Sequence, residues 1–152
     1  GIRDYKVTGV QTCALPISPP FQPWRKILEG NDTVLLTTGP IVGGYWRALI
    51  NVPLEKRPSL WLVSELPLSR EAIPSAFLNE VAESKELIIW EEHVCSGGLG
   101  QMLSYELAIL GIPIRSYSHR HALGYRSGYM GSQNFHRCES GISSSDISEV
   151  CK

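Results

Sequence analysis

The sequence has 152 residues, of which 43% are hydrophobic and 19% are charged, as is typical of one soluble globular domain with its own core. A formal net charge of −1 provides little electrostatic attraction for nucleic acid or for an anionic membrane surface. No apolar run is long enough to span a bilayer and no secretory signal is visible. We therefore expect a cytoplasmic protein that binds neither nucleic acid nor membrane.

Residues 1–23 do not resemble the rest of the chain. Residues 7–18 show no amphipathic period, and they closely resemble a translated sequencing-adapter read-through of the kind found in assembled environmental, or metagenomic, sequences. Residues 19–23 have the proline-rich composition of a linker. We predict that residues 1–23 are a non-native or disordered leader and linker, and that residues 24–152 form the domain.

The first part of this domain alternates strands with helices. Residues 33–39 are β-branched and apolar and end in a glycine, which predicts a strand. Apolar residues recur at helical spacing over residues 41–50, a second strand follows over residues 60–64, and a short helix is outlined by residues 73–81.

The central stretch, residues 87–110, combines a strand, a polar corner and a helix. Residues 87–90 are an apolar run suited to a strand buried on both faces. The charged corner and a glycine-rich turn come next, and residues 99–110 keep helical spacing until Gly111 and Pro113. We predict a fourth strand over residues 113–117, an irregular segment over residues 119–141, and a last helix that is capped near residues 143–146 and truncated by the end of the sequence.

This order predicts an α/β fold, a three-layer α/β/α sandwich with a mostly parallel sheet and room for one antiparallel edge strand. Ligands and partners of such sheets meet the carboxyl ends of the strands. The polar corner of the central stretch is therefore the predicted position of a functional site.

Three ionisable residues, Glu91, Glu92 and His93, follow the buried run. One interpretation is a cluster that binds a ligand or a neighbouring domain, with the paired carboxylates supplying an acid. The favoured interpretation is that one carboxylate bonds to the N-terminus of the following helix while the other groups face an interface.

The glycines of the turn, Gly97, Gly98 and Gly100, also allow two interpretations. Adjacent glycines at a helix start expose backbone N–H groups that hold phosphate or another anion. The spacing is neither a dinucleotide-binding fingerprint nor a P-loop, so close packing of the strand on the helix is favoured.

The polar segment beyond Ser118 holds further candidates for an anion-binding or interface role: His119, His121, Gln133, His136 and Arg137. His119 and His121 project to one side if their segment is extended, but two histidines without a third ligand make no metal site.

The four cysteines show no zinc spacing and are expected to be reduced and unligated. No nucleophile arrangement is visible, so no catalytic residue is assigned.

At the corner the chain resembles the C-terminal domain of transketolase, a family of thiamine-diphosphate-dependent enzymes. The family pattern of an apolar strand, Glu-Glu-His and Gly-Gly-Leu-Gly occurs here as residues 89–100. Residues 33–39 are similar to the opening strand and glycine of that domain, and Pro67-Leu68-Ser69 is similar to its Pro-Leu-Asp turn, with serine in place of the acid. The resemblance covers roughly residues 25–150.

The resemblance implies a C-terminal accessory and dimer-interface domain of a parent enzyme that transfers two-carbon units. In this family, thiamine diphosphate and its divalent metal are bound by the two preceding domains, for which this chain has no room. We therefore expect no cofactor on this fragment and little activity of the isolated chain. The implied partners are the remaining domains and a second subunit, in a homodimer or heterotetramer. The open alternatives are the C-terminal domain of a 2-oxo acid dehydrogenase beta subunit and an independent module that binds an anion or a sugar phosphate.

Overall fold

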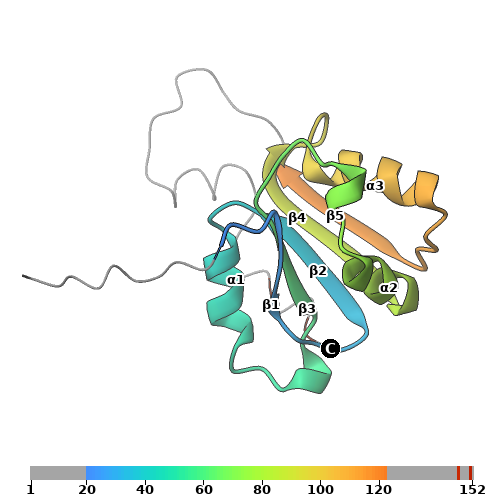
Figure 1. Ribbon diagram of the computed structural model, residues 1–152. Coiled ribbons are helices and arrows are strands. Elements are labelled where there is room, and N and C mark those ends of the chain that lie inside the picture. Colours follow the sequence, from blue (N-terminus) through green and yellow to red (C-terminus); the bar gives the residue numbers. More distant parts are fainter. Residues whose placement is uncertain (1–19, 123–146, 148–150, 152) are drawn as a thin grey trace, which may run out of the picture.

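The computed structural model of the protein describes residues 20–122, together with Ile147 and Cys151. In this part of the chain, five strands form one sheet in the order β1-β3-β2-β4-β5 (Figure 1). The strands are β1 (Trp24–Leu28), β2 (Thr33–Thr38), β3 (Ser59–Val63), β4 (Glu86–Val94) and β5 (Tyr117–Ala122). The α-helices are α1 (Val42–Leu49), α2 (Ser75–Glu83) and α3 (Leu99–Leu110), and two 3-10 turns cover Leu54–Lys56 and Arg70–Ala72.

The sheet is mostly parallel, as the sequence predicts. Strands β3, β2, β4 and β5 pair in parallel, while the edge strand β1 pairs with β3 in the antiparallel direction. Helix α1 covers one face, and α2 and α3 cover the other (Figure 1). The three-layer α/β fold and its single antiparallel edge strand are thus confirmed.

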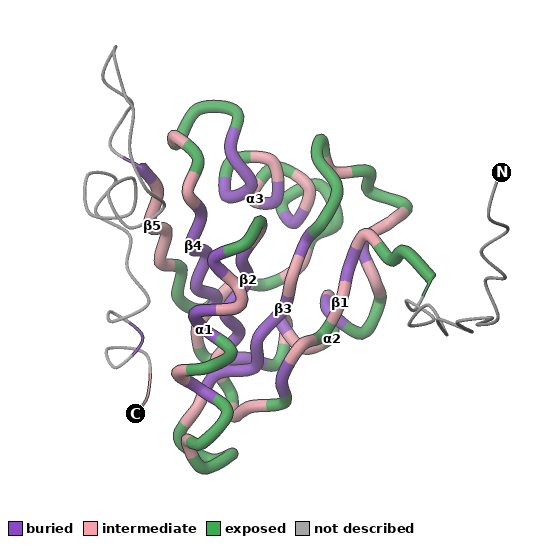
Figure 2. Tube along the Cα trace, turned by 90° about the vertical axis from the view of Figure 1, so that its left-hand side faces the viewer, coloured by how far each residue is buried: buried purple, intermediate pink, exposed green. Residues whose placement is uncertain are grey.

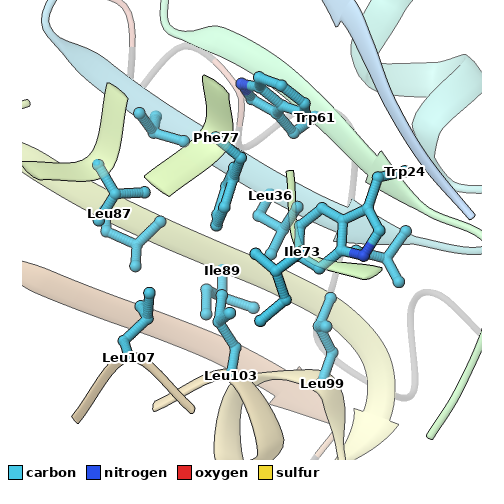
Figure 3. Packing of buried hydrophobic residues seen from close by; sticks show 13 residues of the cluster. Trp24, Leu36, Trp61, Ile73, Phe77, Leu87, Ile89, Leu99, Leu103 and Leu107 are labelled. Atoms are coloured by element: carbon cyan, nitrogen blue, oxygen red, sulfur yellow. The ribbon is translucent and has the colours of Figure 1, made fainter. Parts of the chain in front are cut away.

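The face beneath α2 and α3 carries the larger apolar cluster. The ring of Phe77 from α2 packs against the rings of Trp24 and Trp61 (Figure 3). Its centroid lies 4.9 Å from that of Trp24 and 5.3 Å from that of Trp61. Leu103 and Leu107 extend the cluster from α3 over the central strands. Full burial of each large apolar side chain contributes about 1.5–3 kcal/mol, so this layer is a main source of stability.

The opposite face packs against α1 through Tyr45 and Leu49. Successive residues of β2 and β4 alternate between the two layers, so Ile88 and Trp90 meet α1 while Leu87 and Ile89 meet the α2–α3 side. Buried residues accordingly follow one another along the central strands β2 and β4 (Figure 2). This double burial explains why these strands have continuous apolar sequences.

Two element boundaries differ from the prediction. Strand β4 continues to Val94, so Glu91, Glu92 and His93 lie within the strand rather than after it. Strand β5 begins at Tyr117, where the fourth strand was expected to end, and it includes the first residues of the segment expected to be irregular. Its polar sequence is compatible with a strand because β5 pairs with β4 and most of its residues are only half-buried. The residues 1–19 of the predicted leader, most of the polar segment with Gln133, His136 and Arg137, and most of the predicted last helix lie outside the described residues.

The helices of the described part are short. With 8, 9 and 12 residues, none of α1, α2 and α3 approaches the length that crossing a membrane requires.

Candidate functional site: the acidic corner between β4 and α3

The polar corner lies at the carboxyl edge of the parallel strands. The chain leaves β2 towards α1 on one face, whereas it leaves the adjacent β4 towards α3 on the other face. This reversal is the topological switch point, where sheets of this class bind their ligands. The two strands are joined there by a hydrogen bond of 2.8 Å from Thr37 Oγ1 to the Trp90 carbonyl. The next residue is Glu91.

Glu91 is completely buried, and both carboxylate oxygens are engaged at the start of α3. The Leu99 N–H donates to Oε2 at 2.6 Å, and the Gly100 N–H donates to Oε1 at 2.9 Å. The first N–H groups of a helix have no intrahelical acceptor and carry partial positive charge. A carboxylate at this position accepts their hydrogen bonds and is attracted by that charge. The expectation that one carboxylate of the pair bonds to this helix start is therefore confirmed for Glu91.

His119 reaches the same carboxylate from β5. Its Nε2 lies 2.7 Å from Glu91 Oε1, and its side chain is only 12% exposed. Pairing of Ile89 with His119 in the sheet places both side chains on the α3 side. Glu91 thus connects β4, α3 and β5 through one buried group. Because charge-assisted bonds in a water-poor site are stronger than neutral ones, this junction is expected to be rigid.

Two of the glycines are required by this junction. A Cβ on Gly98 would lie 2.6 Å from both Glu91 oxygens, and a Cβ on Gly100 would lie 2.5 Å from the His119 ring. Gly97 adopts a φ of +76°, which L side chains rarely take. The glycines therefore admit the carboxylate and the imidazole, in agreement with the packing interpretation of the sequence.

The N–H groups of the two glycines that precede α3 have protein partners as well. The Gly97 N–H donates to Gln101 Oε1 at 2.6 Å, and the Gly98 N–H points to the Cys95 carbonyl at 3.4 Å. A phosphate at this position would have to displace Glu91 and meet its negative charge. The geometry therefore disfavours the anion-binding alternative at Gly97–Gly100.

The other candidates are more accessible. Glu92 is half-buried, and His93 is exposed, with its Nδ1 2.9 Å from the Val94 carbonyl. The turn residues Cys95 and Ser96 are exposed too. The exposed residues His93, Cys95 and Ser96 are accessible from solvent, whereas Glu91 is not.

Tyr117 completes the junction at the outer side of α3. Its hydroxyl lies 3.2 Å from Ser104 Oγ and 3.4 Å from the Gly100 carbonyl. Burial raises the pKa of this phenol, and the Ser104 hydrogen bond opposes the rise. The hydroxyl therefore stays protonated at neutral pH.

Cys95 lies at a position that the sequence does not predict. The thiol lies beside the two histidines of β5, and one donor atom from each of Cys95, His119 and His121 falls within 4.8 Å of the others. The prediction that the two histidines project to the same side is confirmed, since their ring centroids are 4.9 Å apart. The premise that they lack a third possible ligand is wrong. Cys95 reaches the two histidines because β5 lies beside β4, and this pairing cannot be read from the sequence alone.

A separate hollow opens at the opposite edge, near the amino ends of β2 and β4. It has a volume of about 540 Å³ and is lined by Asn31, Asp32, Thr33, Glu55, Lys85 and Glu86. The lining carries three carboxylates, those of Asp32, Glu55 and Glu86, against one lysine, and Lys85 forms an ion pair with Asp32. An anionic ligand is therefore disfavoured here as well.

Comparison with known proteins supports the fold. Neither a protein family model nor a curated protein matches the sequence. Among solved structures, the chain is similar to one described as "Split gene transketolase, inactive beta4 tetramer", with a TM-score of 0.63 and 17% sequence identity. The match covers 86% of this chain and 42% of the transketolase chain, so this chain spans less than half the length of that protein. The likeness shows a transketolase-like fold.

Proposed function

We propose that this chain is the C-terminal accessory and dimer-interface domain of a transketolase-like, thiamine-diphosphate-dependent enzyme that transfers two-carbon units. The observation that carries the proposal is the similarity of 86% of the chain to part of a split transketolase. Residues 89–100, which hold the main motif of the sequence resemblance, form a strand-to-helix corner at the switch point of this fold.

A non-catalytic role is consistent with how the corner uses its groups. Glu91 is the one buried carboxylate of the described part, and its bonds to α3 and His119 occupy both oxygens. A general acid must reach a substrate proton directly or through water, which this buried carboxylate does not do. The buried groups of the corner therefore stabilise the fold, and the exposed groups around them are the ones that would contact other domains.

The described residues do not fit thiamine diphosphate. A diphosphate needs cationic or N–H donors, and its divalent metal needs converging carboxylates. The N–H groups of Gly97, Leu99 and Gly100 already bind Gln101 and Glu91, and the hollow at the amino edge is acidic. In the proposed parent enzyme the cofactor and metal would be held by other domains, and no step of the reaction is assigned to this chain.

The proposed partners are those other domains and a second subunit. The similar solved structure is described as a tetramer, and this chain has an apolar surface suited to association. We call it the outer stripe of α3; it consists of the apolar residues Tyr105, Ala108 and Ile109 with the polar Gln101 beside them, all exposed. Tyr105 is 64% exposed and Ile109 is 47% exposed, which is unusual for large apolar groups next to each other on one helix.

Calorimetric titration tests the cofactor part of the proposal. Thiamine diphosphate with Mg²⁺ should release no binding heat on the isolated chain. It should bind to a longer protein in which the coding sequence upstream of Trp24 is restored. Micromolar binding to the isolated chain would contradict the proposal.

Activity of the restored protein tests the reaction class. Two-carbon transfer between sugar phosphates would support a transketolase-like parent. Decarboxylation of a 2-oxo acid with transfer to a lipoyl acceptor would instead assign the domain to a 2-oxo acid dehydrogenase beta subunit. A restored protein with neither activity and no cofactor binding would overturn both assignments.

A further inference from the structure

We propose that Cys95, His119 and His121 form a zinc site at the junction of β4, α3 and β5, with three protein ligands and a fourth position open to water. The observation is that one donor atom from each of these residues lies within 4.8 Å of the other two. A thiolate with two imidazoles is a donor set that Zn²⁺ prefers. The inference does not depend on the proposed function, because it uses this chain's own side chains.

The sheet brings the three residues together. His119 and His121 are two residues apart on β5, so their side chains share the α3 face. Cys95 follows the last residue of β4, and Val94 of that strand pairs with Ala122 of β5. The turn into α3 therefore carries the thiol to the end of β5 where the two imidazoles stand.

Each imidazole has one nitrogen fixed by a neighbouring acceptor. His121 Nδ1 lies 3.0 Å from the Ala122 carbonyl, which can only accept a hydrogen bond. Nδ1 of His121 is therefore the protonated nitrogen, and Nε2 carries the lone pair of the neutral ring.

His119 is fixed in the complementary sense. Its Nε2 donates to Glu91 Oε1 at 2.7 Å, and that carboxylate is itself held by two N–H groups of α3. Nδ1 of His119 is left with the lone pair. A ligand histidine whose other nitrogen bonds to a carboxylate or a backbone carbonyl is the usual arrangement around protein-bound metals.

The distances fit zinc after a small movement. Bonds of about 2.0 Å to nitrogen and about 2.3 Å to sulfur place the ligand atoms of a tetrahedral site about 3.5 Å apart. The donors must therefore approach by about 1 Å. Cys95 is exposed in a turn and His121 is half-buried, so both side chains have room to rotate, while Glu91 holds His119 in place.

Binding has a structural consequence. Zinc would connect the turn before α3 to β5, and a ligand that binds only the folded chain raises its stability by mass action. The same residues in reduced form without zinc would leave an exposed thiol at the carboxyl edge.

The test uses the full chain, reduced with a thiol-free phosphine. Isothermal titration with Zn²⁺ should give one equivalent bound, and Co²⁺ should produce thiolate-to-metal charge-transfer absorption in the near ultraviolet. Cys95→Ser should remove this absorption and weaken zinc binding at least tenfold, and His121→Ala should weaken zinc binding to a similar degree. His119 is left unchanged because it also bonds to Glu91.

The matched controls are His93→Ala and Cys151→Ser, an exposed histidine and a half-buried cysteine outside the cluster. Both should leave the stoichiometry, the affinity and the cobalt spectrum unchanged, and circular dichroism should show that every variant is folded. The proposal is overturned if the unaltered chain binds no zinc, if Cys95→Ser retains the charge-transfer absorption, or if His93→Ala weakens binding as much as His121→Ala.

Discussion

Glu91 shows how one residue determines the arrangement of its surroundings. Its carboxylate lies where three elements meet and accepts bonds from Leu99, Gly100 and His119. The sequence indicates that one acid of the Glu91–Glu92 pair bonds to the helix, but it does not indicate which. Strand alternation decides: Ile89 and Glu91 share the α3 side, and Trp90 meets the α1 side.

Replacing Glu91 with glutamine tests this role. The amide keeps the volume but turns an NH₂ group towards a backbone N–H donor and removes the charge. We expect a loss of about 2–4 kcal/mol in the free energy of unfolding, measured by urea denaturation. The exposed Glu83 of α2 is the matched control, and Glu83→Gln should change the free energy by less than about 0.5 kcal/mol. Equal effects of the two substitutions would refute the role assigned to Glu91.

Gly100 gives a second prediction at this scale. Gly100→Ala places a methyl group 2.5 Å from the His119 ring, which must move away from Glu91. The expected cost is about 1–3 kcal/mol, and combining the change with His119→Ala should give less than the sum of the two separate costs.

Gly43 of α1 is the control for this substitution, because a Cβ there would meet only Arg47 Nη1, at 3.9 Å. Gly43→Ala should be neutral or stabilising by up to about 1 kcal/mol, since alanine favours the helix. Thermal or urea unfolding is measured for Gly100→Ala, His119→Ala, the double variant and Gly43→Ala. The comparison decides whether the tight contact at Gly100 exists.

At the scale of elements, the sequence predicts best where burial is strongest. The strands at the centre of the sheet and all three helices are found close to their expected positions because apolar residues recur with the matching period. Strand β5 was misplaced because its sequence, YSHRHA, has no apolar alternation and its residues are mostly half-buried. Tertiary pairing with β4, which a single sequence does not reveal, makes it a strand.

Strand β1 was not assigned for a related reason. It pairs with only one neighbour, β3, and its middle residues are partly exposed, so the pattern over five residues is weak. Its first residue, Trp24, is buried against Phe77 of α2. Contacts far apart in the sequence therefore determine an element that local pattern leaves open.

Phe77 tests the contribution of this layer. Phe77→Ala removes the ring between Trp24 and Trp61 and is expected to cost about 3–5 kcal/mol, because a cavity remains in a close-packed core. Phe21→Ala is the matched control, since Phe21 is 67% exposed, and it should cost less than about 0.5 kcal/mol. Chemical denaturation compares the two. A similar loss for both would mean that the α2 layer is not packed as described.

For the whole molecule, the layer order and the mostly parallel sheet are confirmed by the structure, whereas the strand order is not contained in the sequence pattern. The corner between β4 and α3, which the sequence singles out as the candidate site, stays a prediction. The grouping of Cys95 with His119 and His121 was missed, since their proximity arises only when β5 is placed beside β4.

The proposed association through the outer stripe of α3 is a prediction at this scale. Tyr105→Glu combined with Ile109→Glu introduces charge into that surface and should lower the molar mass measured by light scattering, if the chain self-associates through it. Leu54→Glu, at a 53% exposed position in the turn after α1, is the control and should leave the mass unchanged. An unaltered mass in the double variant of a self-associating chain would exclude the stripe as its interface.

The direction of β1 has a consequence for any larger protein that contains this domain. Because β1 is antiparallel, Trp24 pairs with Val63 at the last position of β3, so the polypeptide arrives at the same edge as Glu91. The arrival point is three strand spacings from β4, about 14 Å. A parallel β1 would move it by the strand length, about 16 Å, to the far rim. In such a protein, an upstream domain joined to β1 by a short linker would lie within reach of the corner residues, and its surface would be present there at a high local concentration.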